Sequence, residues 1–244
     1  MSTKPTIHTC LSPSLLHLYD LTESVVVIID VLRATSTIAA ALHNGARYII
    51  PVEKVSECIE LGKKIDGITA GERDGRVAEG LQYGNSPFEY PPSFISDKVL
   101  ILTTTNGTKL LHMAVSAAAA EIITGAFSNL SAVCRHLIDQ GKPVVLACAA
   151  WKDRVNLEDT LFAGAVVNEL TATFDVPCDA SKIASSLYRE AKPDLFEFMK
   201  NRNASHYRRL MGFGLERDIR HCLTADTAPV LPIYQEEKLL KYNG

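Results

Sequence analysis

Polar residues of the kind that bind anions gather directly after an apolar run near the start of the chain. The run Val25–Ile29 is typical of a buried strand, and DVLRATST follows it over Asp30–Thr37, before an alanine-rich helical pattern. The first backbone N–H groups of a helix have no partner within the helix and carry partial positive charge, so this turn predicts an anion site. Arg33 adds charged donors, and Thr35 and Ser36 add hydroxyls.

A second turn of the same kind follows the apolar run Val99–Thr103. Asn106, Gly107 and Thr108 lie between this run and a helical pattern that begins at Lys109. Glycine there lets the backbone approach a ligand closely. The alternative is that these residues are only helix caps and turn formers, as Ser, Thr, Asn and Gly commonly are. Two such turns in corresponding positions favour an anion site over that alternative.

A third polar segment, Gly71–Pro87, is rich in glycine and charge. It reads GERDGRVAEGLQYGNSP and includes Glu72, Arg73, Asn85 and Ser86. Long loops inside a compact domain are usually functional or disordered. Closely spaced Gly, Tyr and Pro favour order, so we expect a functional loop.

Four carboxylates fall near the expected carboxyl ends of strands, where ligands bind in open α/β sheets. They are Asp30, Glu72, Glu158 and Asp159. Oxygen ligands without a histidine cluster suit Mg²⁺, which keeps several waters and bridges to a substrate phosphate. The alternative is that Glu158 and Asp159 serve only the start of their helix, where acids complement the helix dipole.

Other phosphate-binding motifs are absent from the sequence, with one exception. Neither a G-x-x-x-x-G-K-[ST] loop nor a G-x-G-x-x-G turn that opens a helix occurs. Cys148 and Arg154 have the C-x5-R spacing of thiol phosphatases, but the loop between them has no glycine. A nucleophilic thiolate would need a lowered pKa. A cysteine-nucleophile phosphatase that uses Cys148 and Arg154 stays open as an alternative.

Short apolar runs alternate with helical patterns from Ser24 to about Leu170, which predicts a layered α/β/α fold with a mostly parallel sheet. The expected strands are Val25–Ile29, Tyr48–Val52, Val99–Thr103, Glu121–Thr124 and Val144–Cys148. The expected helices between them are Thr35–Leu42, Val55–Lys64, Lys109–Ala120 and Leu130–Asp139.

The rest of the chain has mainly helical patterns. Helices are expected over Leu157–Leu170, Ser181–Arg189, Pro193–Asn201 and Ser205–Met211, with a further amphipathic turn in GLERDIRHCL and a last strand in VLPIY. Pro193 is placed as the first residue of its helix, a position that proline favours.

Two segments of the chain resemble each other. VVVIIDVLRATSTIAAAL followed by YIIPVE matches VLILTTTNGTKLLHMAVS followed by EIITGAFSN in order and spacing. This favours an internal duplication of βαβ units, although all such units look alike. No low-complexity linker is present, so we expect a single compact domain over residues 1–244. Two lobes, about 1–95 and 96–244, are the alternative.

The composition limits the class of partner. The 244 residues are 47% hydrophobic with a formal net charge of −3, which argues against nucleic acid and anionic membrane but allows a small anion. The six cysteines are scattered and lack zinc-site spacing, which predicts reduced thiols in a cytoplasmic protein. No apolar run reaches the roughly 18 residues that a membrane helix needs. Apolar helix faces in the last third of the chain suggest a homodimer.

The polar segments together resemble the Mg²⁺-dependent 2-phosphosulfolactate phosphatases of coenzyme M biosynthesis. The matching runs are DVLRATST, GERDGRVAEGLQYGNSP, TTTNGT, GAFSN and LEDTLFAGA, with a weaker echo in SHYRRLMGFGLERDIRHCLTAD and VLPIY. The resemblance spans nearly the whole chain in order. It implies a layered α/β fold and hydrolysis of the phosphate ester of a sulfonated lactate, which releases 3-sulfolactate and phosphate.

The resemblance also implies which residues surround the active site. We expect Asp30, Glu72 and Asp159 to hold Mg²⁺ and, together with Glu158, to form the catalytic group. Whether hydrolysis is direct or proceeds through a phosphoenzyme is open. The substrate-binding residues expected from the turns and the resemblance are Arg33, Thr35, Ser36, Arg73, Asn85, Ser86, Asn106, Gly107, Thr108 and Asn129.

The chain departs from the family pattern after its fifth expected strand. Cys148-Ala149-Ala150 stands where Cys-Ala-Gly is expected, and Asp153 replaces a second glycine. A closely related phosphorylated hydroxy acid is therefore an alternative substrate. A protein of another class, a non-catalytic binding module for a small multi-anionic metabolite, could use the same turns. Such a module has no use for Asp30 and Glu72 beside its arginines, so the sequence favours an enzyme.

Overall fold

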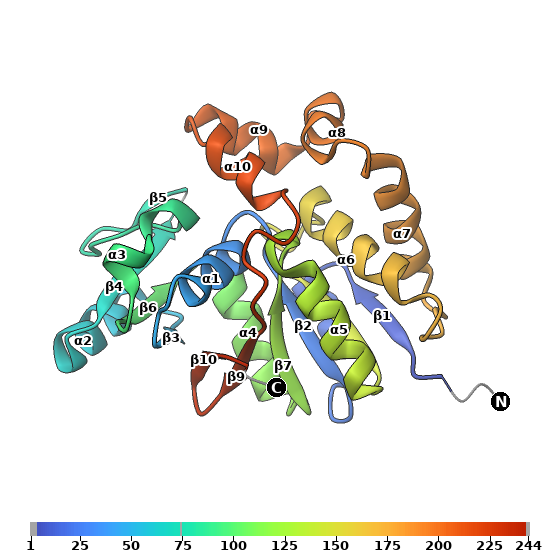
Figure 1. The fold of residues 1–244 in the computed structure, drawn as a ribbon, viewed down its shortest axis with the longest axis horizontal. Helices are drawn as coiled ribbons and strands as arrows, with labels where there is room; N and C mark the ends of the chain where they lie inside the picture. The colour runs from blue at the N-terminus through green and yellow to red at the C-terminus, as the bar shows by residue number, and fades with distance from the viewer. Residues whose placement is uncertain (1–3, 74, 243–244) are drawn as a thin grey trace.

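The computed structural model describes residues 4–73 and 75–242, and within them ten strands form one sheet (Figure 1). The strand order is β1-β8-β2-β7-β9-β10-β3-β6-β4-β5. Most of the neighbouring pairs are parallel, and helices pack on both faces. The predicted layered α/β fold with a mostly parallel sheet is confirmed.

The five strands expected between Val25 and Cys148 are confirmed, each with ends within one residue of the expected ones. The strands are β1 (Ile7–Cys10), β2 (Val25–Ile29), β3 (Tyr48–Pro51), β4 (Ile68–Arg73), β5 (Arg76–Val77), β6 (Val99–Thr103), β7 (Glu121–Gly125), β8 (Val144–Cys148), β9 (Pro232–Gln235) and β10 (Lys238–Lys241).

The sheet consists of two parallel halves that run in opposite directions. One half contains β1, β8, β2 and β7, and the other contains β3, β6 and β4. The hairpin of β9 and β10 joins them, antiparallel to β7 on one side and to β3 on the other. The sequence suggested that the polar turns meet at a single edge of parallel strands. Because the two halves run in opposite directions, the turns are not brought together in that way.

Two helices between the halves bring these turns together instead. α1 (Ala34–His43) and α4 (Gly107–Ser116) pack on a face that both halves share, as Figure 1 shows. Ile38 of α1 and Leu110 of α4 belong to one core cluster with side chains of β2 and β6, such as Val26. Because α1 follows β2 and α4 follows β6, the starts of the two helices meet in the middle of the protein.

The two similar segments of the sequence form the units β2–α1–β3 and β6–α4–β7. β2 pairs with β7 and β3 pairs with β6, so each unit begins in one half of the sheet and ends in the other. This mutual arrangement fits an internal duplication. Strands from both sides of residue 95 enter each half, and the division into one domain or two lobes stays a prediction.

Other helices cover the outer faces of the sheet. The half that contains β2 is covered by α5 (Leu130–Gln140), α6 (Leu157–Leu170) and α7 (Asp179–Ala191), and the other half by α2 (Val55–Ile65). The shorter segments are η1 (Pro13–Leu18), η2 (Pro87–Glu89), α3 (Pro92–Ile95) and η3 (Phe127–Asn129).

The last three helices, α8 (Leu195–Asn201), α9 (Ser205–Gly212) and α10 (Glu216–Cys222), form a cap over one end of the sheet (Figure 1). The ring of His221 in α10 lies 4.8 Å from that of Phe88 in η2, which joins the cap to the other half of the protein.

α8 begins two residues later than the predicted start at Pro193. Asp194 is the cap, because its carboxylate accepts the amide of Glu197 at 2.9 Å. Pro193 precedes this cap, so the helix-start position predicted for Pro193 is wrong.

The structure adds strands that apolar patterning did not indicate. β4 ends in the polar residues Glu72 and Arg73, yet it pairs with β6 from Ile68 to Gly71. β5 then pairs with the end of β4 as a short hairpin. The segment expected to be one long loop, Gly71–Pro87, therefore begins as strand. β4 pairs with β6 on one side and with β5 on the other, which fixes the position of Glu72.

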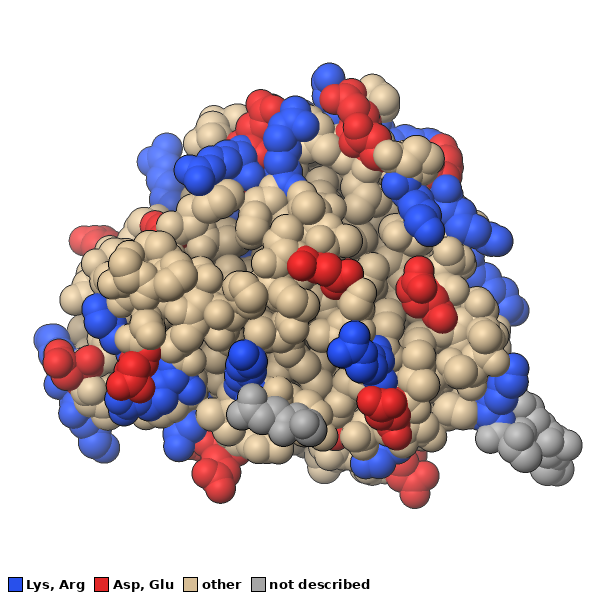
Figure 2. All heavy atoms as spheres, in the orientation of Figure 1, with Lys and Arg blue, Asp and Glu red and all other residues tan. Residues whose placement is uncertain are grey.

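Charged side chains of both signs are spread over the face of the molecule that Figure 2 shows. Among the helices that the structure describes, none is both long enough and apolar enough to cross a membrane.

The contact between α6 and α7 generates a prediction for stability. A Cβ added at Gly164 would lie 2.0 Å from the carbonyl oxygen of Ala184. We expect Gly164→Ala to lower the free energy of unfolding by about 1–3 kcal/mol, because the helices must separate. Urea unfolding followed by circular dichroism measures this change. Gly212→Ala, where a Cβ meets nothing within 4 Å, is the control. Equal stability of the two variants would contradict the packing.

Candidate active site

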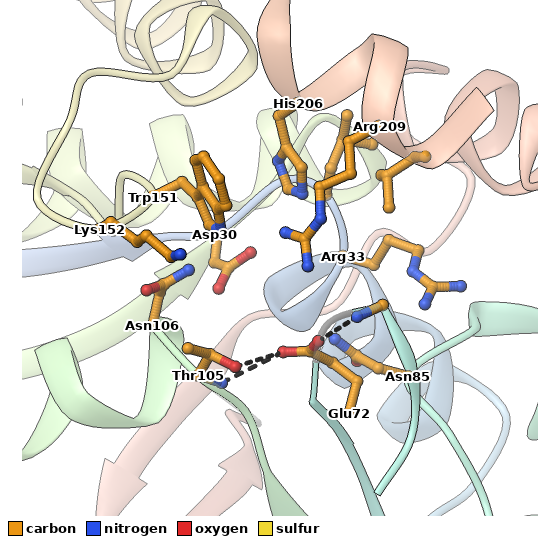
Figure 3. A pocket seen from close by; sticks show the side chains of 13 residues that line it. Asp30, Arg33, Glu72, Asn85, Thr105, Asn106, Trp151, Lys152, His206 and Arg209 are labelled. Atoms are coloured by element: carbon orange, nitrogen blue, oxygen red, sulfur yellow. Dashed lines mark hydrogen bonds between the residues drawn. The ribbon is translucent and has the colours of Figure 1, made fainter. Parts of the chain in front are cut away.

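The polar turns from both halves of the sheet open into one pocket with a cavity of about 60 Å³ (Figure 3). Its walls come from the ends of β2, β4 and β6, the loop after β8, and α9. Five predicted site residues line it: Asp30, Arg33, Glu72, Asn85 and Asn106. The other lining residues were not predicted, and they are Leu32, Gly75, Thr105, Trp151, Lys152, His206, Arg209 and Leu210.

Asp30 follows β2, and the turn around it is closed by its own hydrogen bonds. The amide of Thr35 donates to the carbonyl of Asp30 at 2.9 Å, and the amide of Asp30 donates to Oγ1 of Thr35 at 3.1 Å. The hydroxyl of Ser36 donates to the carbonyl of Val31 at 2.8 Å. Thr35 and Ser36 are buried and outside the pocket lining. Their role in substrate binding stays a prediction.

The carboxyl group of Asp30 has an unusual pKa. Burial raises the pKa of Asp30 to about 6; His206 acts in the opposite direction, and Glu72 adds to the rise. Carboxyl groups whose pKa is shifted towards neutrality occur preferentially at functional sites. Asp30 therefore stands out as a reactive group of the pocket.

At the start of α4, Gly107 packs directly against Asp30. A Cβ at Gly107 would lie 2.9 Å from Oδ2 of Asp30 and 3.1 Å from the first residue of α1. Only glycine lets the two helices start so close together. Asn106 in the same turn lines the pocket. Thr108 closes the turn instead, since its hydroxyl donates to the carbonyl of Thr104 at 2.8 Å.

Glu72 enters the pocket from the end of β4 (Figure 3). Its Oε1 accepts hydrogen bonds from the amide and the hydroxyl of Thr105, at 3.2 and 3.0 Å. Its Oε2 accepts the amide of Gly75 at 2.9 Å. These bonds join the β4–β5 hairpin to the turn before α4 and hold the carboxylate in place.

Three other residues predicted to bind substrate lie outside the pocket lining. The guanidinium of Arg73 donates to the hydroxyl of Thr103 at 3.0 Å. Ser86 caps η2 and accepts the amide of Phe88 at 3.3 Å. Asn129 is buried and bonds to three backbone groups, at 2.9, 3.2 and 3.0 Å. All three stabilise local structure, and their role in binding stays a prediction.

Asn85 contributes an unpaired polar atom to the pocket. The residue is 4% exposed, and its Oδ1 has no hydrogen-bond partner among the described residues. The backbone carbonyl oxygen of Asn85 accepts a hydrogen bond from the hydroxyl of Thr37 at 3.1 Å, which fixes this part of the loop to α1. Leaving a buried carbonyl oxygen unpaired costs about 1–3 kcal/mol. A polar ligand in the pocket would remove that cost.

Arg33 lines the pocket and forms a buried ion pair with Asp218 of α10. The two side chains are 6% and 9% exposed. The pair ties the start of α1 to the C-terminal cap. Asp218 was not predicted, although it lies in the LERD run that carries the weaker part of the resemblance.

The start of α6 holds two buried carboxylates. Oε1 of Glu158 lies 2.6 Å from Nδ1 of His206 in α9, while its Oε2 has no partner among the described residues. Asp159 accepts the amides of Val31 at 3.0 Å and Ala150 at 3.2 Å. Both residues are 1% exposed, and neither lines the pocket.

Burial and charge shift the pKa values of this group. Burial raises the pKa of Asp159 well above its ordinary value, and the carboxylates of Glu158 and Asp30 add to the rise. Burial by itself would lower the pKa of His206, but Glu158 and then Asp30 outweigh it, so the pKa of His206 is raised. The imidazolium form of His206 is thereby favoured.

The loop after β8 has a glycine-like backbone without glycine. Ala150, Lys152 and Asp153 have φ values of 57°, 52° and 58°. Positions 150 and 153 are those where the resemblance leads us to expect glycine. The ring of Trp151 lies 4.9 Å from Nζ of Lys152 and 5.0 Å from the guanidinium carbon of Arg209. Cation–π attraction thus holds two cations at the pocket.

The geometry argues against a cysteine nucleophile. Burial raises the pKa of Cys148 well above its usual value, and the nearby Asp159 raises it further. A nucleophilic thiolate needs the opposite shift. Arg154 is exposed, and neither residue lines the pocket.

The predicted metal ligands are only partly assembled. Within residues 4–73 and 75–242, no three His, Cys, Asp or Glu side chains form a group that could hold a metal ion. Asp159 does not line the pocket with the other two predicted ligands, and each of its carboxylate oxygens accepts a hydrogen bond from a backbone amide. Asp30 and Glu72 do line one pocket. Mg²⁺ commonly binds through one or two carboxylates with waters and a substrate phosphate, so these two residues fit it. The ion itself stays a prediction.

Among the unpredicted lining residues, Leu32 and Thr105 lie in the turns that the sequence had singled out, and most of the others come from α9 and the loop after β8. His206 and Arg209 come from α9, whose sequence SHYRRL indicated only an amphipathic helix. Trp151 and Lys152 come from the loop after β8, where the sequence showed a cysteine–arginine spacing and two missing glycines but did not indicate these two residues. The weak echo in SHYRRLMGFGLERD was the one signal for α9.

Two carboxylates, three cationic side chains and a helix start around one small pocket fit an α/β enzyme that acts on a small anion. A family model described as 2-phosphosulpholactate phosphatase matches residues 10–237. A protein of Caldanaerobacter subterraneus subsp. tengcongensis named probable 2-phosphosulfolactate phosphatase is 42% identical over 217 residues, 87% of this chain and 88% of its own.

Two further proteins with the same name are similar to the chain. That of Thermotoga maritima is 42% identical over 207 residues, 84% of this chain and 87% of its own. That of Picosynechococcus sp. is 38% identical over 221 residues, 88% of this chain and 90% of its own. The chain belongs to the 2-phosphosulfolactate phosphatase family, and it is a phosphoric monoester hydrolase. The resemblance noted in the sequence is confirmed.

The close approach of α1 and α4 generates a prediction for activity. Gly107→Ala should displace the carboxylate of Asp30, and misplacement by about 1 Å can cost about 10²-fold in rate. We expect a loss of this size in kcat/KM for phosphate release, with the fold retained by circular dichroism. Gly212→Ala has open space around its Cβ and should keep full activity. Full activity in Gly107→Ala would show that the contact with Asp30 is unimportant.

The ion pair of Arg33 generates a prediction for stability. Asp218→Ala leaves a buried guanidinium unpaired and should lower the free energy of unfolding by about 3–5 kcal/mol. Asp179→Ala removes a pair with Lys182 whose side chains are 89% and 58% exposed, and it should cost about 0–1 kcal/mol. Urea unfolding of both variants makes the comparison. Similar losses in the two would count against a buried pair.

Proposed function

We propose that this chain hydrolyses the phosphate ester of 2-phosphosulfolactate, or of a closely related phosphorylated hydroxy acid, to 3-sulfolactate and phosphate. The observation that carries the proposal is that two carboxylates and three cationic side chains line the same small cavity. They are Asp30, Glu72, Arg33, Lys152 and Arg209. The names of the relatives support the choice of substrate.

The charge of the pocket suits such a substrate. 2-Phosphosulfolactate carries a phosphate, a sulfonate and a carboxylate, so it needs several positive partners. Lys152 and Arg209 are both held close to the ring of Trp151, and Arg33 reaches the pocket from the start of α1. The start of α4 at Asn106 adds the partial positive charge of a helix N-terminus.

Hydrolysis of a phosphate ester depends mainly on positioning and on stabilising charge on the phosphoryl oxygens. A water oxygen bonds to phosphorus, the bond between phosphorus and the ester oxygen breaks, and that oxygen leaves with the electron pair and gains a proton. Asp30 and Glu72 would hold Mg²⁺, which when bound would offset the negative charge of the phosphoryl group. One of the two carboxylates would orient the attacking water.

A non-catalytic module for a small multi-anionic metabolite is the second candidate. It would use the same cations, but it would gain nothing from Asp30 and Glu72, whose charge repels an anion.

A cytoplasmic location, a homodimer and a place in coenzyme M biosynthesis stay predictions, as does the absence of nucleic-acid partners.

The test is phosphate release from racemic 2-phosphosulfolactate, with Mg²⁺ and after removal of metal by EDTA. We expect activity that returns with Mg²⁺, falls by about 10²-fold or more in Asp30→Asn, and survives in Cys148→Ser. A dead Cys148→Ser with an active Asp30→Asn would restore the thiol route. No release by the wild type from this ester or from a panel of phosphorylated hydroxy acids would favour the binding module.

A further inference from the structure

His206 enters the pocket from the cap, on a helix that contributes no predicted catalytic residue. Figure 3 shows its ring directed into the pocket, above Asp30. Nδ1 of the ring lies 2.6 Å from Oε1 of Glu158. Because a carboxylate can only accept, Nδ1 carries a proton in this contact. Nε2, on the far side of the ring from Nδ1, is the nitrogen left for a ligand.

The environment of Glu158 suits a carboxylate that stabilises a positively charged histidine. The side chain of Glu158 is 1% exposed and that of His206 is 11% exposed. The second oxygen of Glu158, Oε2, has no partner among the described residues. A buried carboxylate with one unpaired oxygen is costly unless a positive charge lies beside it. The fold therefore places an anion where it stabilises a positively charged ring of His206.

The proposed hydrolysis needs a group of this kind. The leaving group is the alkoxide of a secondary alcohol, which is strongly basic and departs readily only when it is protonated. Arg33 and Arg209 line the pocket but cannot give up a proton usefully at neutral pH. Asp30 and Glu72 are already assigned to the metal ion and to the attacking water. The assignment leaves Lys152 and His206 as proton donors, and an imidazolium is a stronger acid than an ammonium ion. His206 is therefore the better donor.

We propose that His206 is the general acid of the reaction and that Glu158 is its positioning residue. The proposal rests on the proposed function. As the bond between phosphorus and the ester oxygen breaks, that oxygen takes the electron pair and accepts the proton of Nε2. His206 becomes neutral, and Nδ1 keeps its hydrogen bond to Glu158. A proton lost from the attacking water returns the ring to its charged form, directly or through solvent.

The same contact could instead serve only to anchor the cap, because it joins α9 to α6. The experiment must separate the two roles. It compares the phosphate ester with its analogue in which sulfur replaces the bridging oxygen. A thiolate leaves without protonation because thiols have low pKa values, near those of cysteine. The two esters share their charged groups and their shape, so an anchoring defect affects both equally.

We expect His206→Gln to lower kcat/KM for the oxygen ester by about 10²–10⁴-fold and for the sulfur ester by less than about 10-fold. Glu158→Gln should give the same pattern with a smaller loss. Matched controls are His43→Gln, at the far end of α1, and Glu169→Gln, in the last turn of α6, which are exposed and outside the pocket lining. Both should match the wild type on both esters.

Equal losses on the two esters, or no loss on either, would overturn the proposal. Should His206→Gln fail to fold by circular dichroism, the ratio of the two losses in Glu158→Gln decides in the same way. Failure of the proposed function looks different. In that case the wild type releases phosphate from neither ester, before any variant is compared, and the role of His206 falls with it.

Discussion

The active site depends on one contact, that of Gly107 with Asp30. The chain brings its two polar turns together from opposite halves of the sheet, and only the missing side chain at Gly107 lets the starts of α1 and α4 touch. Once they touch, Asp30, Asn106 and Thr105 face the same space. Glu72 then joins them through its bonds to the turn before α4. The geometry of the pocket is thus set by the close packing of the two helix starts and by the hydrogen bonds of Glu72.

The second constraint is electrostatic. Asp30, Glu158 and Asp159 share one crowded, largely buried region, and burying carboxylates is costly unless they are paired or hydrogen-bonded. Backbone amides bond to both oxygens of Asp159, and His206 partners Glu158. The pKa values of both Asp30 and Asp159 are raised, in each case mainly by burial, and of these two only Asp30 lines the pocket. A protein selected for stability alone would not collect these charges here.

The sequence predicted those parts of the fold and the site that local chemistry determines. Apolar runs such as Val25–Ile29 identified the central strands, and turns that follow such runs identified Asp30 and Asn106. β4 was missed because its end is polar and its strand character comes from pairing with β6. His206 and Trp151 were missed because only tertiary packing brings α9 and the loop after β8 to the pocket. Residues that form turns, such as Thr108, are of the same types as residues that bind substrate. Only the structure shows that the hydroxyl of Thr108 is bonded within the turn.

The hairpin of β9 and β10 lies between β7 and β3, although it comes last in the described chain. During synthesis the ribosome therefore delivers both halves of the sheet well before the piece that joins them. Contacts of such long sequence separation form late and slow folding, because their loop-closure entropy must be overcome first. Until residues 232–241 have emerged, the facing edges of β7 and β3 are open strands, which are the kind of surface that chaperones protect from aggregation.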